Sequence, residues 1–293
     1  MVTAAVPPRS VTGVGDLAAD TEVTGADGRY RARLSPDWEI WGPCGGYIAA
    51  VLLRAAGAHT ALRRPATLAC HFLGVAAFED VDLEVETLRA TRRTESLRVS
   101  MRQDEAPIAE AILWCVAGDL DGPELRATAM REVPAPEDAP LIDDLLDGDQ
   151  RSPHAFWQNF EYRPLSWVGP DKWSERVDDP ATFRAWYRFV PAAVFDDPYL
   201  EAARVAMLVD IAGWPALIRG LSPADEERWI APSLDLAVAF HAPPQGSEHL
   251  LLDGFASVAT GGLAAGGGSV WSPDGRLLGS GTQQLMFRPL TTS

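Results

Sequence analysis

Apolar and polar positions alternate along four consecutive segments in the first half of the chain. The alternation is clearest in residues 81–86, which read Val-Asp-Leu-Glu-Val-Glu. Because a period of two sends successive side chains to opposite faces, each segment is typical of an antiparallel strand with one buried face. The predicted strands are residues 65–74, 81–90, 95–103 and 107–117, and a further strand is predicted at 29–34.

A continuous apolar segment separates the strand at 29–34 from the other four. Its seven residues, 47–53, form the longest apolar run of the chain. A helix that is apolar on nearly all sides is buried on nearly all sides, so residues 45–57 predict a central helix. Gly45 and Gly46 begin this segment and would leave the first N–H groups of the helix open to a ligand.

The second half of the chain repeats this order of elements. It contains a strand at 182–190, a helix near 199–219 and strands at 233–242, 249–258, 262–272 and 276–288. Phe72 corresponds to Phe240 at an offset of 168 residues, and the polar turn at 104–106 corresponds to the turn at 273–275 at an offset of 169. An offset that is kept over more than forty residues indicates a duplicated unit.

A strand, a long apolar helix and four antiparallel strands are the order of a hot-dog unit, an α+β fold in which a curved sheet wraps around one helix. Two such units predict a double hot-dog with sheets joined edge to edge, because this removes two exposed sheet edges. Another pair of α+β domains stays open as the alternative. We expect an N-terminal unit at 1–130, a linker and insert at 131–180, and a C-terminal unit with the catalytic residues at 181–293.

Three segments lie outside the repeat. Residues 1–20 are typical of a loose tail, and residues 131–150, rich in acids and proline, are typical of a linker. Residues 151–180 are too aromatic for a solvated loop, so we expect them to pack over the core or to line the mouth of a pocket. The aromatic residues concerned are Phe156, Trp157, Phe160, Tyr162, Trp167 and Trp173.

Composition narrows the classes of function. Of the 293 residues, 47% are hydrophobic and 23% are charged, as in an ordinary globular protein. The net charge of −16 disfavours nucleic acid and anionic membranes as partners, although Arg89, Arg92 and Arg93 predict a local basic patch. Neither a signal peptide nor a membrane-spanning helix is expected, which favours a cytoplasmic location. The three cysteines lack metal-ligand spacing, so neither a metal nor another cofactor is expected.

Candidate catalytic residues are found in the second copy. Asp210 stands in the apolar run 206–212, where a carboxylate is costly to bury without a partner; the alternative is that it faces solvent or caps a helix. Ser233 and Asp235 are two residues apart on a strand and share a face. Gln283 and Gln284 face opposite ways, so only one of them can share a pocket with Asp210.

The first copy lacks this acid, hydroxyl and amide. Its residues at the positions of Ser233, Asp235 and the Gln283 region are Pro65, Thr67 and Trp114-Cys115. The asymmetry predicts one site per chain, in a pocket that runs between the two helices, with aliphatic and aromatic walls.

Several motifs in order resemble the acyl-CoA thioesterase II-like, double hot-dog family. The similarity covers most of residues 30–120 and 180–288 but not the aromatic insert. Its motifs are WGPCGGYIAAVLLRAA, VDLEVETLRATRRTESLRVSMRQ and PIAEAILWC in the first copy, and VDIAGWPAL, SLDLAVAFHAPP and SVWSPDGRLLGSGTQQLMFR in the second.

The resemblance implies an acyl-CoA thioesterase that uses an Asp-activated water. In that family an Asp, a Thr and a Gln hold the water; these positions are Asp210, Ser233 and Gln283 here. Ser233 keeps the hydroxyl of the usual Thr, whereas Leu236 stands where the family usually has His. We further expect the N–H groups at Gly45 and Gly46 to meet the developing oxyanion, because they lie at the positive end of a helix.

Other classes fit less well. The chain has no GxSxG nucleophile motif, the glycines at 261–268 lack the Lys-Ser/Thr of a P-loop, and no His is close in sequence to Cys44. The hot-dog hydratases have a His five residues after their Asp. Pro215 stands at that position here, which disfavours dehydration chemistry. A protein that only binds acyl thioesters, an enzyme acting on carrier-bound acyl groups, and a homodimer all stay open.

Overall fold

The computed structural model describes residues 14–146, 152, 154–165, 181–222, 225 and 228–290. Within them, twelve antiparallel strands form one continuous sheet. The first half of the sheet holds, in spatial order, β1 (Thr24–Ala26), β2 (Arg29–Arg33), β4 (Asp80–Ala90), β5 (Thr94–Gln103), β6 (Ala106–Val116) and β3 (Arg64–Phe72). The second half continues with β10 (Asp235–Phe240), β13 (Leu277–Met286), β12 (Leu263–Trp271), β11 (His249–Thr260), β8 (Thr182–Phe189) and β7 (Phe160–Pro164).

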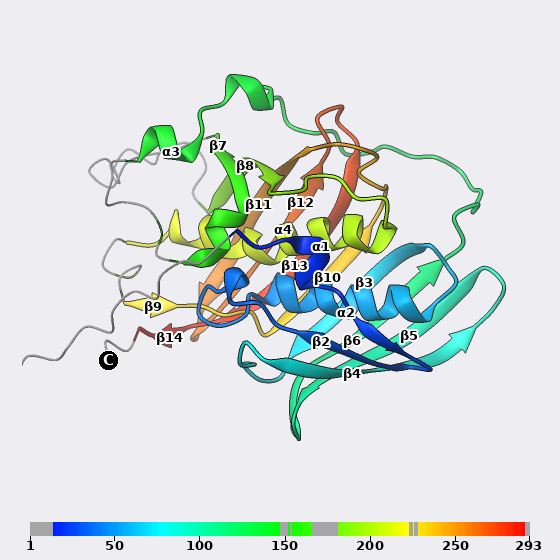
Figure 1. The fold of residues 1–293 in the computed structure, drawn as a ribbon. Coiled ribbons are helices and arrows are strands. Elements are labelled where there is room, and N and C mark those ends of the chain that lie inside the picture. Colours follow the sequence, from blue (N-terminus) through cyan, green and yellow to red (C-terminus); the bar gives the residue numbers. More distant parts are fainter. Residues whose placement is uncertain are drawn as a thin grey trace, which may run out of the picture.

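Each half of the sheet packs against one long helix (Figure 1). Helix α2 (Gly45–His59) contacts β4, β5 and β6, and helix α4 (Pro198–Ile218) contacts β8, β11, β12 and β13. Asp197 caps the start of α4 by accepting a hydrogen bond from Tyr199 N, and Pro198 takes the first helical position. The double hot-dog predicted from the alternating pattern is confirmed.

The two helices also pack tightly against each other. A Cβ atom on Gly46 would lie 2.7 Å from the Cα of Met207, and one on Gly57 would lie 2.6 Å from the Cγ of Tyr199. Glycine at these positions lets the backbone of α2 approach α4 more closely than any side chain would allow. This contact brings the first turn of α2 beside the middle of α4.

The register at the seam between β3 and β10 follows the duplication. At the offset of 168 residues Ala69 corresponds to Ala237, and these two residues pair with each other. The flanking pairs are images of one another: Leu68 with Val238, and Cys70 with Leu236. The two units therefore meet about an approximate twofold axis that passes through the Ala69–Ala237 pair.

The described part of the acidic linker, residues 131–146, packs on the outer face of the second half of the sheet. The indole N–H of Trp186 on β8 donates to the carbonyl of Pro134 at 2.9 Å, and Ala139 is buried against Trp271. The linker includes the short helices η2 (Pro136–Asp138) and α3 (Ile142–Leu145). Our division of the chain at 1–130, 131–180 and 181–293 remains a proposal. Strand β7 lies in the middle segment, yet it extends the second half of the twelve-stranded sheet.

Two segments outside the repeat pack against the core where the structure describes them. The prediction of a loose tail is wrong for residues 14–20. Helix α1 (Leu17–Asp20) buries Leu17. The Asp20 carboxylate accepts a hydrogen bond at 2.9 Å from the indole of Trp38, which lies in η1 (Pro36–Trp38). The aromatic insert packs as expected where it is described, because Phe156 and Phe160 are buried. Trp167 and Trp173 lie outside the described residues.

No helix in the described ranges is long and apolar enough to cross a membrane.

Candidate active site

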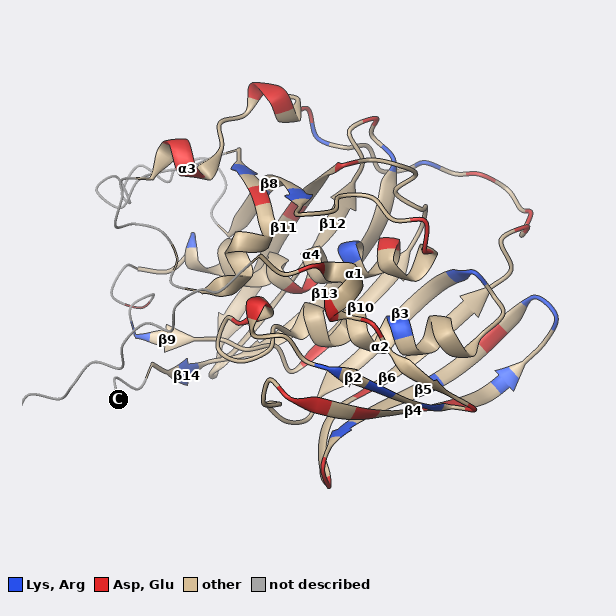
Figure 2. Ribbon diagram, in the orientation of Figure 1, with Lys and Arg blue, Asp and Glu red and all other residues tan. Residues whose placement is uncertain are grey.

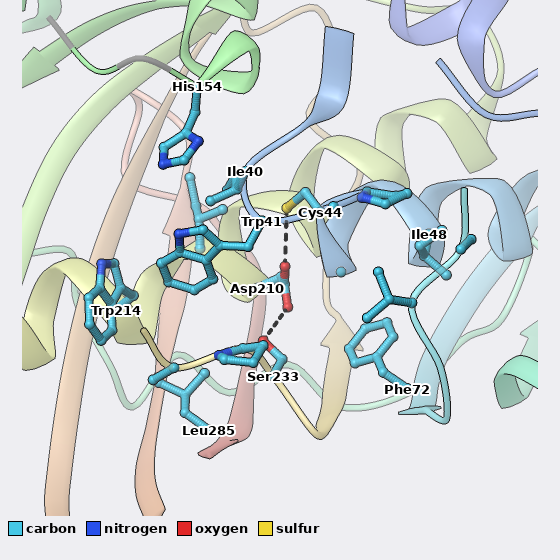
Figure 3. A pocket seen from close by; sticks show the side chains of 18 of the residues that line it. Ile40, Trp41, Cys44, Ile48, Phe72, His154, Asp210, Trp214, Ser233 and Leu285 are labelled. Carbon is cyan, nitrogen blue, oxygen red and sulfur yellow. Dashed lines mark hydrogen bonds between the residues drawn. The ribbon is translucent and has the colours of Figure 1, made fainter. Parts of the chain in front are cut away.

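Asp210 lies on α4 opposite the first turn of α2 and is 7% exposed. Its Oδ2 accepts hydrogen bonds from the backbone N of Gly46 at 2.6 Å and from the Sγ of Cys44 at 3.4 Å. Its Oδ1 accepts from the Oγ of Ser233 at 3.0 Å (Figure 3). These three donors, together with the positive end of α2, compensate the carboxylate for lost hydration. Asp210 therefore does not face solvent, although its bond from Gly46 N does cap the first turn of α2.

Burial raises the pKa of Asp210, and the bonds from Gly46, Ser233 and Cys44 oppose the rise. Desolvation is the larger effect because the carboxylate sits in the packed interior. A carboxylate with a raised pKa takes a proton more readily than an ordinary aspartate. Such a group suits general-base chemistry near neutral pH.

Ser233 connects Asp210 to Gln283. Its Oγ lies 3.0 Å from the Oε1 of Gln283 and 3.0 Å from the Oδ1 of Asp210, but its one proton can serve only one of these acceptors. The Nε2 of Gln283 has no hydrogen-bond partner among the described residues. A half-turn of the amide would let Nε2 donate to Ser233 while Ser233 donates to Asp210. Each of the two contacts of Ser233 then joins one donor to one acceptor.

Glycine is required on both sides of this chain. A Cβ on Gly45 would lie 2.9 and 3.0 Å from the two carboxylate oxygens of Asp210, and one on Gly213 would lie 2.3 Å from the Nε2 of Gln283. Gly45 lines the neighbouring cavity. The N–H of Gly46 points to Asp210, so it is not available to an oxyanion as the sequence suggested, and of the two glycines only Gly45 keeps that proposed role.

The thiol of Cys44 is a member of the site that sequence reasoning set aside. Burial raises the pKa of this thiol well above its usual value, and the neighbouring Asp210 raises it further. Cys44 is therefore a protonated donor to the carboxylate and a poor nucleophile. The signal available in the sequence was its place directly before Gly45.

A cavity of about 300 Å³ opens at Asp210. Its walls are mainly apolar, and the rings of Trp41 and Trp214 meet edge to face at 5.5 Å on one side (Figure 3). The aromatic insert contributes His154 and Trp157. Other lining residues are Ile40, Cys44, Gly45, Ile48, Phe72, Val75, Ile108, Ile211, Pro215, Ser233 and Leu285. The cavity thus has the expected wall chemistry but lies at the start of α2, and Ile48 is the last α2 residue that lines it.

Gln283 does not line this cavity. It is 3% exposed and lies behind Ser233. Asp235, which opens β10 two residues after Ser233, instead accepts from Gln284 N at 2.7 Å, which is a structural contact between strands. Asp210 and Ser233 are therefore the members of the acid–hydroxyl–amide set that a bound molecule could touch.

Within the described residues 14–130, the first copy has no counterpart of this set. Pro65 pairs with Cys115 as Ser233 pairs with Leu285, which supports the equivalence of Pro65 and Ser233. Two residues before Cys115, on the same strand face, the counterpart of Gln283 is the buried Leu113, whereas Trp114 is 38% exposed on the outer face. No group of three His, Cys, Asp or Glu side chains that could hold a metal ion occurs among the described residues.

Comparisons with known proteins agree with this architecture. The N-terminal domain of acyl-CoA thioesterases matches residues 34–116, and the C-terminal domain matches residues 135–287. No curated protein sequence matches the chain at a significant level.

Three solved structures illustrate the similarity. A tesB protein from Mycobacterium avium subsp. paratuberculosis is 25% identical, with a TM-score of 0.73 and coverage of 94% of this chain and 99% of that one. The acyl-CoA thioesterase II TesB2 from Mycobacterium marinum is 20% identical, with a TM-score of 0.75 and coverage of 95% and 100%. A hot-dog protein of unknown function from Alicyclobacillus acidocaldarius is 23% identical, with a TM-score of 0.71 and coverage of 93% and 97%. Since the two domain matches span most of its length, the chain belongs to the acyl-CoA thioesterase family, a family of thioester hydrolases.

Proposed function

We propose that this protein hydrolyses an acyl-CoA to the free acid and CoA, with Asp210 as the general base. The observation that carries the proposal is the Asp210 carboxylate on the cavity wall, buried and held by Gly46, Cys44 and Ser233. A base held rigidly by several donors needs little reorganisation when the reaction begins.

The reaction would proceed by direct attack of water on the thioester carbonyl. Asp210 takes one proton from the water as its oxygen bonds to the carbonyl carbon, and the carbonyl becomes an oxyanion. The N–H of Gly45, at the start of α2, stabilises this charge. When the intermediate collapses, the C–S bond breaks, and the proton on Asp210 passes to the departing CoA sulfur.

Ser233 and Gln283 have supporting roles in this proposal. Ser233 touches both Asp210 and the cavity, so its hydroxyl can orient the attacking water. Gln283 contacts Ser233 from behind and fixes the direction of that hydroxyl. The acyl group occupies the apolar cavity, whose size falls at the lower end of the range for small-molecule sites.

The direct test is release of free thiol from a panel of acyl-CoAs of graded chain length. We expect turnover by the wild-type protein and its loss in Asp210→Asn. If the wild-type protein binds acyl-CoA without releasing CoA, it is a binding protein, and the hydrolysis proposed here is wrong. If it hydrolyses only acyl groups on a carrier protein, the assignment of CoA as the leaving group is wrong.

A further inference from the structure

A small two-stranded sheet stands beside the cavity. It pairs β9 (Trp229–Ile230) with β14 (Arg288–Pro289). Strand β9 leads directly into Ala231, Pro232 and Ser233, which line the cavity, and β14 follows the lining residue Leu285. The small sheet therefore continues the wall of the proposed active site away from Asp210.

Two arginines come together on this sheet. Arg288 pairs with Ile230, and the N–H of Leu290 donates to the carbonyl of Arg228 at 2.8 Å. This register makes Arg228 and Arg288 diagonal neighbours, whose Cβ atoms in such a pair lie about 7–8 Å apart or less. Both residues are exposed, and Figure 2 shows β9 and β14 side by side, each with a basic (blue) segment at it.

Aromatic packing holds the two strands of this small sheet together. The rings of Trp229 and Phe287 meet at 6.1 Å, and the guanidinium of Arg228 lies 5.1 Å from the centre of the Trp229 ring. A guanidinium held against an aromatic face loses less conformational freedom when it binds an anion. Arg228 thus has an aromatic support, on a small sheet that continues from the cavity-lining residues Ala231 and Pro232.

Neither arginine forms an ion pair with any residue that the structure describes. Other arginines of the second unit do have such partners, as Arg188 has Glu248 and Arg276 has Asp274. Two neighbouring guanidinium groups without a carboxylate repel each other, and an anion between them removes the repulsion. In a chain with a net charge of −16, an anionic ligand also needs such a local cationic site in order to approach.

The number of residues between the site and the arginines is compatible with the length of an acyl-CoA. Arg228 is five residues from Ser233, and Arg288 is five residues from Gln283, along extended chain in both cases. Five extended residues span at most about 17 Å. The pantetheine arm, with its two amide groups, is about as long as four or five extended residues and separates the thioester from the phosphates of CoA.

We propose that Arg228 and Arg288 bind the pyrophosphate of coenzyme A while its thioester lies at Asp210. This inference rests on the proposed thioesterase function and adds the group that recognises the CoA portion of the substrate. Arginine suits this task because its planar guanidinium donates two parallel hydrogen bonds to a phosphate. Because of the arginine pair, the protein should bind a phosphate-bearing thioester more tightly than the same acyl group on a shorter thiol.

The experiment compares two thioesters of the same acyl group, the CoA ester and the N-acetylcysteamine ester, which has no phosphate. In the double variant Arg228→Glu/Arg288→Glu, KM for the CoA ester should rise about 10-fold or more at low salt, because reversed charges now repel the phosphates. The kcat for both esters and KM for the N-acetylcysteamine ester should stay within twofold of wild type, roughly the limit of a neutral change. The milder variant Arg228→Gln/Arg288→Gln should give a smaller rise.

A matched control reverses two charges elsewhere. The variant Arg89→Glu/Arg92→Glu changes the net charge equally on the hairpin between β4 and β5, and KM for the CoA ester should change less than twofold. An equal rise in this control would show a general field effect and overturn the proposal. An equal rise of KM for both esters in the Arg228/Arg288 variants would show structural damage and would also overturn it.

Failure of the thioesterase function would look different. If the wild-type protein hydrolyses neither ester, calorimetric binding of CoA itself to the wild-type protein and to the Arg228→Glu/Arg288→Glu variant still tests the phosphate site. We expect the wild type to bind about 10-fold more tightly. Equal binding, or no binding by either protein, would overturn the site.

Discussion

The carboxylate of Asp210 lies in the packed interior between two helices, where Gly46, Cys44 and Ser233 are its hydrogen-bond donors. Burial raises its pKa in the folded protein above the ordinary value of 3.8. The folded state therefore holds this proton more tightly than the unfolded state. The contribution of Asp210 to stability is full below the unfolded pKa and is lost as pH rises through the folded pKa.

Asp210→Asn should therefore stabilise the protein at neutral pH while removing the proposed base. We expect the free energy of unfolding to rise by roughly 0.5–2 kcal/mol, the usual range for a stabilising substitution. Thermal unfolding at pH 4 and at pH 8 measures this difference in the free energy of unfolding. The difference between Asp210→Asn and wild type should be larger at pH 8. A variant that is less stable than wild type at pH 8 would show that the three donors outweigh desolvation.

The thiol of Cys44 should tune this base. Its hydrogen bond lowers the pKa of Asp210, so Cys44→Ala should shift the acid limb of the kcat/KM profile to higher pH, because a protonated Asp210 cannot accept a proton from water. Cys44→Ser keeps a donor and should restore the wild-type limb. An unchanged limb in Cys44→Ala would mean that the thiol fills space and nothing more.

At the residue scale, Asp210, Ser233 and Gln283 stood out as an acid, a hydroxyl and an amide in predicted elements, and the family resemblance implied their joint role. The contacts of Cys44 and Gly46 with Asp210 join positions 166 and 164 residues apart. Such contacts depend on how closely two helices approach, and periodicity carries no information about that distance. For the same reason the sequence did not predict that His154 would reach the cavity wall.

At the scale of elements, the close crossing of α2 and α4 places the donors on Asp210. Gly46→Ala should push the helices apart, because its Cβ would lie 2.7 Å from the Met207 backbone. We expect a loss of about 1–3 kcal/mol in the free energy of unfolding, as for overpacked cores, together with reduced turnover.

Chemical denaturation of Gly46→Ala measures this loss. The control is Gly118→Ala, since a Cβ on Gly118 meets no atom within 4 Å. Its stability should equal that of wild type within about 0.5 kcal/mol. Equal stability of the two variants would contradict the tight crossing.

Elements with a strong period were predictable almost to the residue. The strands at 81–90 and 95–103 were expected one residue short of β4 and β5 because their alternation is regular. Strand β7 was not predicted: its five residues, Phe-Glu-Tyr-Arg-Pro, alternate between apolar and polar, but so short a run was assigned to the aromatic insert around it. Pairing with β8, a tertiary contact, decides its conformation.

At the scale of the whole molecule, one continuous sheet joins a unit that lacks the acid–hydroxyl–amide set to a unit that carries it. The seam at Ala69 and Ala237 keeps the symmetry of the backbone, whereas Pro65 and Leu113 replace Ser233 and Gln283 on the other side. Titration with a tight, non-hydrolysable thioester analogue should therefore give about one site per chain. Two equivalent sites would contradict the asymmetry.

A homodimer stays a prediction, which light scattering can measure.

The central claim is that Asp210 activates the water that cleaves the thioester. The measurement that tests it most directly is kcat on the best acyl-CoA for the wild type, Asp210→Asn, Ser233→Ala and Gln283→Ala. We predict that Asp210→Asn lowers kcat by roughly 10²-fold or more, and that the other two lose less, because they orient the water and its partners without taking the proton. Near-normal kcat in a folded Asp210→Asn variant would contradict the account.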